Sequence, residues 1–263
     1  MGVLNVTPDS FSDGGRAFRH GRVDVDAALA IAQSMADDGA AIIDVGGEST
    51  RPGSAPIDLD EELRRVIPVV EQLARSATIV SVDTNKAGVA RAALDAGADL
   101  INDIGALGDA AMRRVVGSSG AAVCLMHMQG EPRTMQDAPR YLDVVSEVGG
   151  YLLERARTCE ADGIGRDRIL IDPGFGFGKM LSHNIALLRG LGTVAALGYP
   201  VLVGVSRKGM IGALTGRSIG ERLAGSIAAA VIAVQNGAKI VRAHDVAATV
   251  DALNVTARFM EET

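Results

Sequence analysis

Short aliphatic runs alternate along the chain with longer segments in which apolar residues recur every three or four positions. Residues 24–40 and 61–75 are examples of the longer kind, and their spacing predicts amphipathic helices. The short runs are rich in Val, Ile, Leu and Ala, which is typical of parallel strands covered by helices on both faces. They occur at residues 3–6, 41–45, 79–83, 100–104, 122–127, 169–172, 201–206 and 239–244.

The regular alternation of eight strand candidates with helices predicts an α/β fold, a single-domain (β/α)8 TIM barrel over residues 1–263. The alternative is an open doubly wound sheet, whose dinucleotide-binding form carries a glycine fingerprint that this chain lacks. In the barrel, we expect the active site at the carboxyl ends of the strands, where the βα loops meet.

The composition disfavours several classes of protein. A net charge of −6 argues against a nucleic-acid partner, because nucleic acids are usually bound by a basic face. No apolar run approaches the ~18 residues of a membrane-spanning helix. The opening segment MGVLNV lacks the basic start of a signal peptide. Cys124 and Cys159 show no metal-ligand spacing and are expected to be reduced structural thiols, so we expect a cytoplasmic protein.

Every predicted strand ends in polar or ionisable residues. A single such residue is explained as readily by a hydrogen bond that anchors a loop. In a closed barrel, however, all eight ends converge on one rim, and capping alone does not account for that. The residues are Asn5, Asp44, Asp83, Asn102, Asp103, His127, Asp172, Ser206, Arg207, Lys208, Arg242 and His244.

These side chains have a consistent chemical character. Carboxylates and amides at Asp83, Asn102 and Asp172 suit a small heterocycle with ring nitrogens and an exocyclic amine. Lys208, Arg242 and His244 are expected to supply positive charge for an anionic leaving group or a carbonyl oxygen. By contrast, the charged segment that begins with Glu61 and Glu62 is expected to be a solvated helix face.

The stretch ILIDPGFGFGK at residues 169–179 begins as a strand and ends in a glycine-rich loop. It is not a P-loop, because Pro173 occupies the position of the first glycine and Met180 that of the Ser or Thr. Its two aromatic residues, with two more in the loop after the first strand, either pack locally or line a flat ligand. These aromatic residues are Phe11, Phe18, Phe175 and Phe177.

Eight ordered segments of the chain resemble the signature blocks of the dihydropteroate synthase family. They are MGVLNVTPDSFSDGG, IDVGGESTRPG, SVDT, INDI, CLMHMQG, LIDPGFGFGK, VGVSRK and VRAHD. The resemblance runs from residue 1 to about 250. It implies a transferase of folate biosynthesis that condenses (7,8-dihydropterin-6-yl)methyl diphosphate with 4-aminobenzoate, works with Mg²⁺, forms a homodimer and is a target of sulfonamides.

The resemblance also implies roles for individual residues. Pterin binding is expected from Asp83, Asn102, Met126, Asp172 and Lys208. The diphosphate is expected at Asn5, Thr50, Arg51, Arg242 and His244, with the metal beside Asn5. The 4-aminobenzoate site is expected at Phe11, Thr50, Pro52, Phe177 and Ser206. The residues with the most direct catalytic roles are expected to be Asp83, Asp172, Lys208 and Arg242.

Two other functions remain compatible with these residues. A corrinoid-linked methyltetrahydrofolate methyltransferase has a similar pterin-binding barrel but does not need the loops at 5–21 and 46–56 as a lid over diphosphate and arylamine. A non-catalytic pterin-binding paralogue is the second alternative, and the polar residues at every strand end argue against it. Release of diphosphate in the presence of both substrates distinguishes the three.

Overall fold

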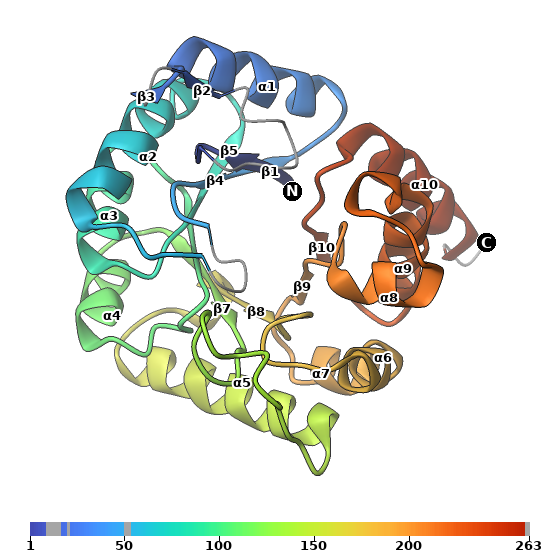
Figure 1. Cartoon of the computed structure of the whole chain (residues 1–263). Coiled ribbons are helices and arrows are strands. Elements are labelled where there is room, and N and C mark those ends of the chain that lie inside the picture. The colour runs from blue at the N-terminus through green and yellow to red at the C-terminus, as the bar shows by residue number, and fades with distance from the viewer. Residues whose placement is uncertain (9–16, 20–21, 50–53, 261–263) are drawn as a thin grey trace.

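The structure is a computed structural model that describes residues 1–8, 17–19, 22–49 and 54–260. Strands form an inner ring that helices surround (Figure 1). The strands of the ring are β1 (Gly2–Asn5), β4 (Ile42–Gly46), β5 (Ile79–Asp83), β6 (Leu100–Asp103), β7 (Ala122–Met126), β8 (Ile169–Asp172), β9 (Leu202–Val203) and β10 (Ile240–Val241). Each coincides with one of the predicted strands.

The ring of strands is closed. Six of them pair in parallel in the order β1-β4-β5-β6-β7-β8, and β9 pairs in parallel with β10. A bridge between Ile171 and Val201 joins β8 to β9, and a bridge between Gly2 and Ala243 joins the end of β10 to β1. The amide of Val3 donates to the carbonyl oxygen of Ala243 at 3.1 Å at this closing seam. The predicted barrel is therefore confirmed, and the open sheet is excluded.

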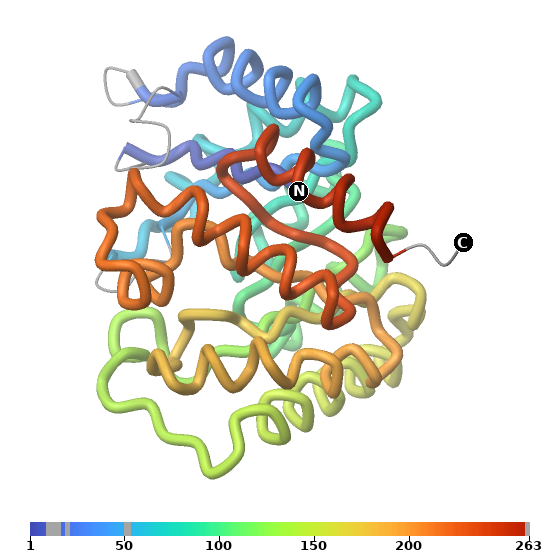
Figure 2. Tube along the Cα trace, turned by 90° about the vertical axis from the view of Figure 1, so that its right-hand side faces the viewer, coloured from blue at the N-terminus to red at the C-terminus, as the bar shows by residue number. Residues whose placement is uncertain are grey.

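The helices form the outer layer, and Figure 2 shows the side covered by the last three of them. They are α1 (Val25–Asp37), α2 (Leu59–Leu73), α3 (Ala87–Asp95), α4 (Ala110–Gly117), α5 (Val144–Ala161), α6 (Leu181–Arg189), α7 (Leu191–Ala195), α8 (Gly209–Thr215), α9 (Leu223–Gln235) and α10 (Val246–Met260). Within the described ranges, no helix is long and apolar enough to cross a membrane.

Local sequence explains where several helices begin. Asp24, Asp58, Asp109 and Asp143 are the N-cap residues of α1, α2, α4 and α5, and each carboxylate accepts a backbone N–H of the first turn. Those N–H groups have no partner within the helix, and the negative charge also lies at the positive end of the helix dipole. The caps thus fix the point at which each of these βα loops enters its helix.

The barrel interior changes from apolar to polar along its axis. Side chains two residues apart on a strand share a face. Leu100 and Asn102 in β6, like Leu170 and Asp172 in β8, therefore share the inner face of the barrel. Leu100 packs with Cys124 and Leu202 in a small cluster made of strand residues, near the amino ends of the strands. The polar member of each pair lies at the carboxyl end, so the strand pattern itself creates a polar mouth.

Four short elements lie outside the predicted pattern. Strand β2 (Phe18–Arg19) pairs antiparallel with β3 (Arg22–Val23) in the segment between β1 and α1. A 3-10 turn, η1 (Arg166–Arg168), precedes β8, and a second, η2 (Ile219–Glu221), precedes α9. The hairpin is too short for its periodicity to stand out in the sequence.

Arg168 links three elements at the amino-terminal face of the barrel. Its guanidinium donates to the carbonyl oxygen of Ala121 at 2.9 Å and to that of Val116 at 2.8 Å. The first of these residues precedes β7 and the second belongs to α4, while Arg168 itself leads into β8. These bonds lie at the opposite end of the barrel from the polar mouth, so their role is structural.

Replacement of Arg168 by Met is expected to lower the free energy of unfolding by about 1–3 kcal/mol, because two carbonyl groups lose charged donors. Urea denaturation measures the change. The matched control is Arg64→Met, which removes an exposed ion pair with Glu61 and should leave the stability nearly unchanged. Equal effects of the two substitutions would contradict the role assigned to Arg168.

Candidate active site

Asp44 is a fully buried carboxylate in the middle of the polar mouth. It accepts hydrogen bonds from the Ser81 hydroxyl at 2.5 Å, the Asn102 amide at 3.3 Å and Nε of Arg242 at 2.6 Å. Strands β5 and β6 and the residue that follows β10 thus supply donors to one side chain of β4. The sequence placed Asp44 at a strand end without giving it a function, and the structure identifies it as the anchor of Arg242.

Arg242 bridges two carboxylates. In addition to its bond with Asp44, its Nη2 donates to Oδ2 of Asp83 at 3.1 Å. The side chain of Arg242 remains 21% exposed, whereas that of Asp44 is 0% exposed. The guanidinium therefore lies at the mouth, and the carboxylate that holds it is buried beneath. Burial raises the pKa of Asp83 to about 7 against the opposing effect of Arg242, and the nearby Asp44 charge raises it further. The protonation of Asp83 is therefore set by its burial together with the charges of Arg242 and Asp44.

The opposite charges of Asp172 and Lys208 interact within the mouth. The backbone amide of Gly174 donates to Oδ1 of Asp172 at 2.7 Å. Burial raises the pKa of Asp172, while this hydrogen bond and the positive charge of Lys208 act in the other direction. Burial in turn lowers the pKa of Lys208 to about 8, although Asp172 partly offsets this effect. The Lys208 ammonium also lies 4.2 Å from the ring centroid of Phe177, within range of a cation–π interaction.

His244 and Ser206 are in contact, as expected for one site. The Nδ1 atom of His244 lies 3.1 Å from the Ser206 hydroxyl oxygen, which also accepts the backbone N–H of His244 at 3.2 Å. Burial, helped by the charges of Arg242 and Arg207, lowers the pKa of His244 to about 3. The expectation that His244 supplies positive charge was therefore wrong for the ligand-free site, where it is a neutral hydrogen-bonding group.

Asn5 and Met126 occupy the positions expected from the sequence. Asn5 ends β1 opposite Gly46 of β4, and a Cβ added to Gly46 would lie 3.5 Å from the Asn5 amide oxygen. Met126 ends β7 opposite Asp172 of β8 and is buried. The aliphatic sulfur side chain of Met126 and the carboxylate of Asp172 therefore come from paired positions.

The described residues contain no cluster of three or more His, Cys, Asp or Glu side chains that could hold a metal ion. Asn5 supplies one amide oxygen at the mouth. Mg²⁺ commonly keeps several water ligands and is held by one or two protein oxygens together with substrate phosphates. A Mg²⁺ ion that arrives with a diphosphate fits this donor set, whereas a metal held by the protein alone does not.

Some expected site residues lie outside the described part of the chain. These are Phe11, Thr50, Arg51 and Pro52. Their roles remain predictions.

Of the aromatic residues that are described, only Phe177 is placed at the site. Phe175 is 1% exposed and belongs to the hydrophobic core. Phe18 lies beneath the guanidinium of Arg65, at 5.4 Å from ring centroid to Cζ. For Phe18 and Phe175, local packing was the correct alternative.

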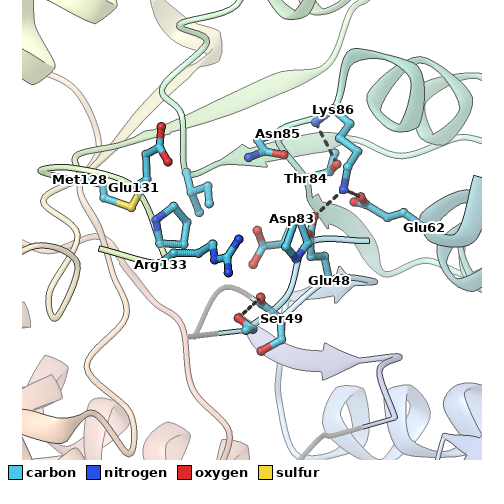
Figure 3. Close-up of a pocket in the computed structure, with 14 residues that line it drawn as sticks. Glu48, Ser49, Glu62, Asp83, Thr84, Asn85, Lys86, Met128, Glu131 and Arg133 are labelled. Carbon is cyan, nitrogen blue, oxygen red and sulfur yellow. Dashed lines mark hydrogen bonds and ion pairs between the residues drawn. The ribbon is translucent and has the colours of Figure 1, made fainter. Parts of the chain in front are cut away.

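Asp83 also lines a cavity of about 400 Å³ (Figure 3). Its wall includes Lys86, whose ammonium is ion-paired with both Glu48 and Glu62 at 2.5 Å. Glu62 is fully buried, and among the residues that the structure describes its Oε1 has no hydrogen-bond partner. The expectation of a solvated helix face was therefore wrong at Glu62, because the sequence gave no indication that Lys86 of the next βα loop covers it.

Replacement of Asp44 by Asn is expected to destabilise the fold by about 3 kcal/mol or more, because Arg242 loses its buried counter-charge. Urea denaturation measures the effect. Ser81→Ala is the matched control, since it removes one neutral donor to the same carboxylate and should cost about 0.5–1.5 kcal/mol. If Asp44→Asn destabilises the protein no more than the control does, Asp44 does not anchor Arg242.

Comparison with known proteins places this site in a family. A model of the family described as pterin binding enzyme matches residues 1–244. Dihydropteroate synthase of Escherichia coli strain K12 is 52% identical over 256 residues, which cover 97% of this chain and 89% of the relative.

Two solved structures show the same fold. Yersinia pestis dihydropteroate synthase, in a complex with a sulfonamide drug, superposes with a TM-score of 0.94 at 47% identity and covers 98% of this chain and 93% of that one. Burkholderia cenocepacia dihydropteroate synthase, complexed with 7,8-dihydropteroate, gives a TM-score of 0.88 at 48% identity, with 98% and 90% covered. The chain therefore belongs to the dihydropteroate synthase family of pterin-binding enzymes.

Proposed function

We propose that the polar mouth of this barrel carries out the reaction of the dihydropteroate synthase family. In that reaction, (7,8-dihydropterin-6-yl)methyl diphosphate condenses with 4-aminobenzoate to give 7,8-dihydropteroate and diphosphate, so the enzyme is an alkyl/aryl transferase of folate biosynthesis. The observation that carries the proposal is Arg242, fixed between Asp44 and Asp83 beside the Asp172–Lys208 pair. Carboxylates that can accept hydrogen bonds from a heterocycle thus lie next to a fixed cation that can bind an anionic group.

The pterin ring is assigned to Asp83, Asn102, Asp172 and Lys208, with Met126 against its face. A pterin presents ring N–H groups and an exocyclic amine side by side, and a carboxylate can accept two such bonds in parallel. These side chains end neighbouring strands, as the pairing of Asp83 with Asn102 shows. The low mobility of strand residues would hold the ring in one orientation.

The chemical step forms a bond between the amine nitrogen and the pterin CH₂ group and breaks the bond from that carbon to diphosphate. Because an arylamine is a weak nucleophile, diphosphate is expected to leave first. The resulting cation is stabilised by the electron-rich ring and by the carboxylates of Asp83 and Asp172, which are already in place. The amine then adds and loses one proton, and no covalent enzyme intermediate is required.

The leaving group is assigned to Arg242, His244 and Asn5. Arg242 provides a positive charge that does not depend on pH, and the neutral His244 contributes a hydrogen bond. Bound Mg²⁺ would neutralise charge on the diphosphate, with Asn5 as the protein oxygen beside it. The expected roles of Thr50 and Arg51 around the diphosphate rest on the family resemblance.

The site for 4-aminobenzoate is assigned to Phe177 and Ser206, together with Phe11, Thr50 and Pro52. Support comes from the position of Phe177 against Lys208 and from the contact of Ser206 with His244. A sulfonamide shares the aryl amine of this substrate and is expected to compete with it. The Yersinia pestis relative has been solved with such a drug.

We further propose that residues 1–263 act as one catalytic domain in a cytoplasmic homodimer. The barrel closes between its first and last strands, which supports a single domain. The two cysteines, Cys124 and Cys159, are free and buried, as expected in a reducing compartment. Exposed apolar side chains on α8 and α9, among them Leu214 and Leu223, are compatible with a subunit contact, which solution mass measurements test.

The direct test of the function is release of diphosphate on mixing the protein with both substrates and Mg²⁺. Turnover that requires both the pterin diphosphate and 4-aminobenzoate is expected. A corrinoid-linked methyltransferase or a non-catalytic pterin-binding protein would release none. The absence of release by folded protein that binds pterin would therefore contradict the proposed function.

Lys208 should also set an alkaline limit on activity. Its pKa is lowered to about 8, so kcat/KM for the pterin diphosphate should fall as the pH rises through that value and the ammonium loses its proton. In Lys208→Arg the cation persists at every accessible pH, so this decline should disappear even if the maximal rate is lower. Lys239→Arg, at an exposed position before β10, should retain it. An unchanged decline in Lys208→Arg would assign the limit to another group.

A further inference from the structure

We propose that Lys179 is a positioning residue that folds the glycine-rich segment 174–178 so that Asp172 and Phe177 face the same substrates. The proposal rests on the function proposed above. It concerns a residue that the expected pterin, diphosphate and 4-aminobenzoate sites do not include. Lys179 follows the last glycine of the segment and is only 2% exposed.

The Lys179 ammonium lies at the centre of a ring of acceptors. Its Nζ lies 2.9 Å from the carbonyl oxygen of Gly174, 3.0 Å from that of Phe177 and 3.4 Å from that of His127. The Nδ1 atom of His127 is a fourth neighbour at 3.0 Å. Burial lowers the pKa of Lys179 to about 7, and the charge of Asp172 partly offsets this effect. In its protonated form Lys179 has three N–H donors and no acceptor, so the polar atoms within hydrogen-bond distance of Nζ must act as acceptors.

His127 meets this requirement because its imidazole is neutral. Burial and the neighbouring Lys179 charge lower the pKa of His127 to about 3. With Nδ1 acting as the acceptor, the ring proton must reside on Nε2. The ring is held edge-on against Tyr151, with 5.0 Å between centroids. His127 is thus the structural partner of Lys179.

The contacts of Lys179 lead directly to two site residues. Gly174 accepts from Lys179 through its carbonyl group and donates its N–H to Oδ1 of Asp172 at 2.7 Å. Phe177 accepts from Lys179 through its carbonyl group, and its N–H closes a turn onto Gly174 at 3.1 Å. The ring of Phe177 packs against Lys208. One buried ammonium therefore fixes the turn that orients both Asp172 and Phe177.

The three glycines allow the segment 174–178 to fold closely around the Lys179 ammonium. Gly174, Gly176 and Gly178 all have positive φ, at 68°, 82° and 58°. A Cβ at Gly174 would overlap the carbonyl oxygen of His127, and one at Gly178 would overlap that of Gln129. The segment therefore packs directly against the chain after β7, and only glycine fits at these two positions. Lys179 is the donor to the carbonyl of Phe177 and a second donor, besides the Phe177 N–H, to the buried carbonyl of Gly174.

Other side chains hold the outer edge of the same segment. Asn184 accepts the N–H of Gly176 at 2.8 Å, Gln136 donates to the carbonyl of Gly176 at 2.5 Å, and Tyr141 donates to that of Gly178 at 2.9 Å. These bonds fasten the segment to α6 and to the loop after β7. Lys179 holds the inner edge, next to the substrates.

The test replaces Lys179 by Met, which retains the length of the side chain and removes its donors. We expect Kd for 6-hydroxymethylpterin and KM for 4-aminobenzoate to rise about tenfold each, a loss of about 1.4 kcal/mol per ligand. Arg168→Met is the matched control, since it also deprives two backbone carbonyls of a basic side chain but at the other end of the barrel. In Arg168→Met, Kd for the pterin and KM for 4-aminobenzoate should stay within about twofold of the native values, because residues at the amino-terminal face of a barrel serve stability.

Nitrogen NMR of the histidines in the native protein supplies a second measurement that does not depend on the variant folding. The chain has four histidines, so assignment is tractable. The expected spectrum has His127 neutral between pH 5 and 8, with its proton on Nε2. A His127 that titrates near its ordinary pKa, or that carries its proton on Nδ1, would overturn the proposal. So would a Lys179→Met protein with the ligand constants of its control.

The two proposals fail in different ways. If native protein releases no diphosphate, the proposed reaction is wrong, and the NMR and pterin-binding results still decide the role of Lys179. If native protein turns over and Lys179→Met keeps native ligand constants, the reaction stands and the positioning role is wrong.

Discussion

The structure of the mouth depends on the burial of one guanidinium between two carboxylates. Without Asp44, whose side chain has no access to solvent, the charge of Arg242 would lose its nearest counter-charge and the protein would be destabilised. Ser81 and Asn102 complete the hydrogen bonds of that carboxylate. The arrangement joins four strands and leaves one edge of Arg242 at the surface of the mouth. A fixed cation of this kind stabilises developing negative charge without reorganisation during the reaction.

In the proposed reaction, different parts of one network bind the pterin and the diphosphate portions of the substrate. Asp83 lies at the junction, because it is bonded to Arg242 and also borders the pterin side. Burial raises the pKa of Asp83 and Asp172 and lowers that of Lys208, and the opposite charges around each group act against these shifts. The charged forms of the three side chains therefore depend on one another.

The sequence predicted the barrel because strands that are buried on both faces read as short aliphatic runs, which alternate with segments of helical period. It also predicted the rim, since each strand end is polar. Long-range partners could not be read in this way: Asp44 and Arg242 are separated by 198 positions, and no local pattern joins them. For the same reason Glu62 was assigned to solvent, and the pKa of His244 was misjudged. Burial by segments distant in the sequence decides each of these properties.

Calorimetry with two ligands tests the central claim most directly. Native protein, Arg242→Met and the charge-balanced Asp44→Asn/Arg242→Met variant are titrated with 6-hydroxymethylpterin and with its diphosphate ester in the presence of Mg²⁺. The account predicts that both variants lose about 10- to 100-fold in affinity for the diphosphate ester, the effect of one charged hydrogen-bond partner, and little for the ligand without the diphosphate. Equal losses for the two ligands would contradict it, because Arg242 would then hold the ring or the fold instead of the leaving group.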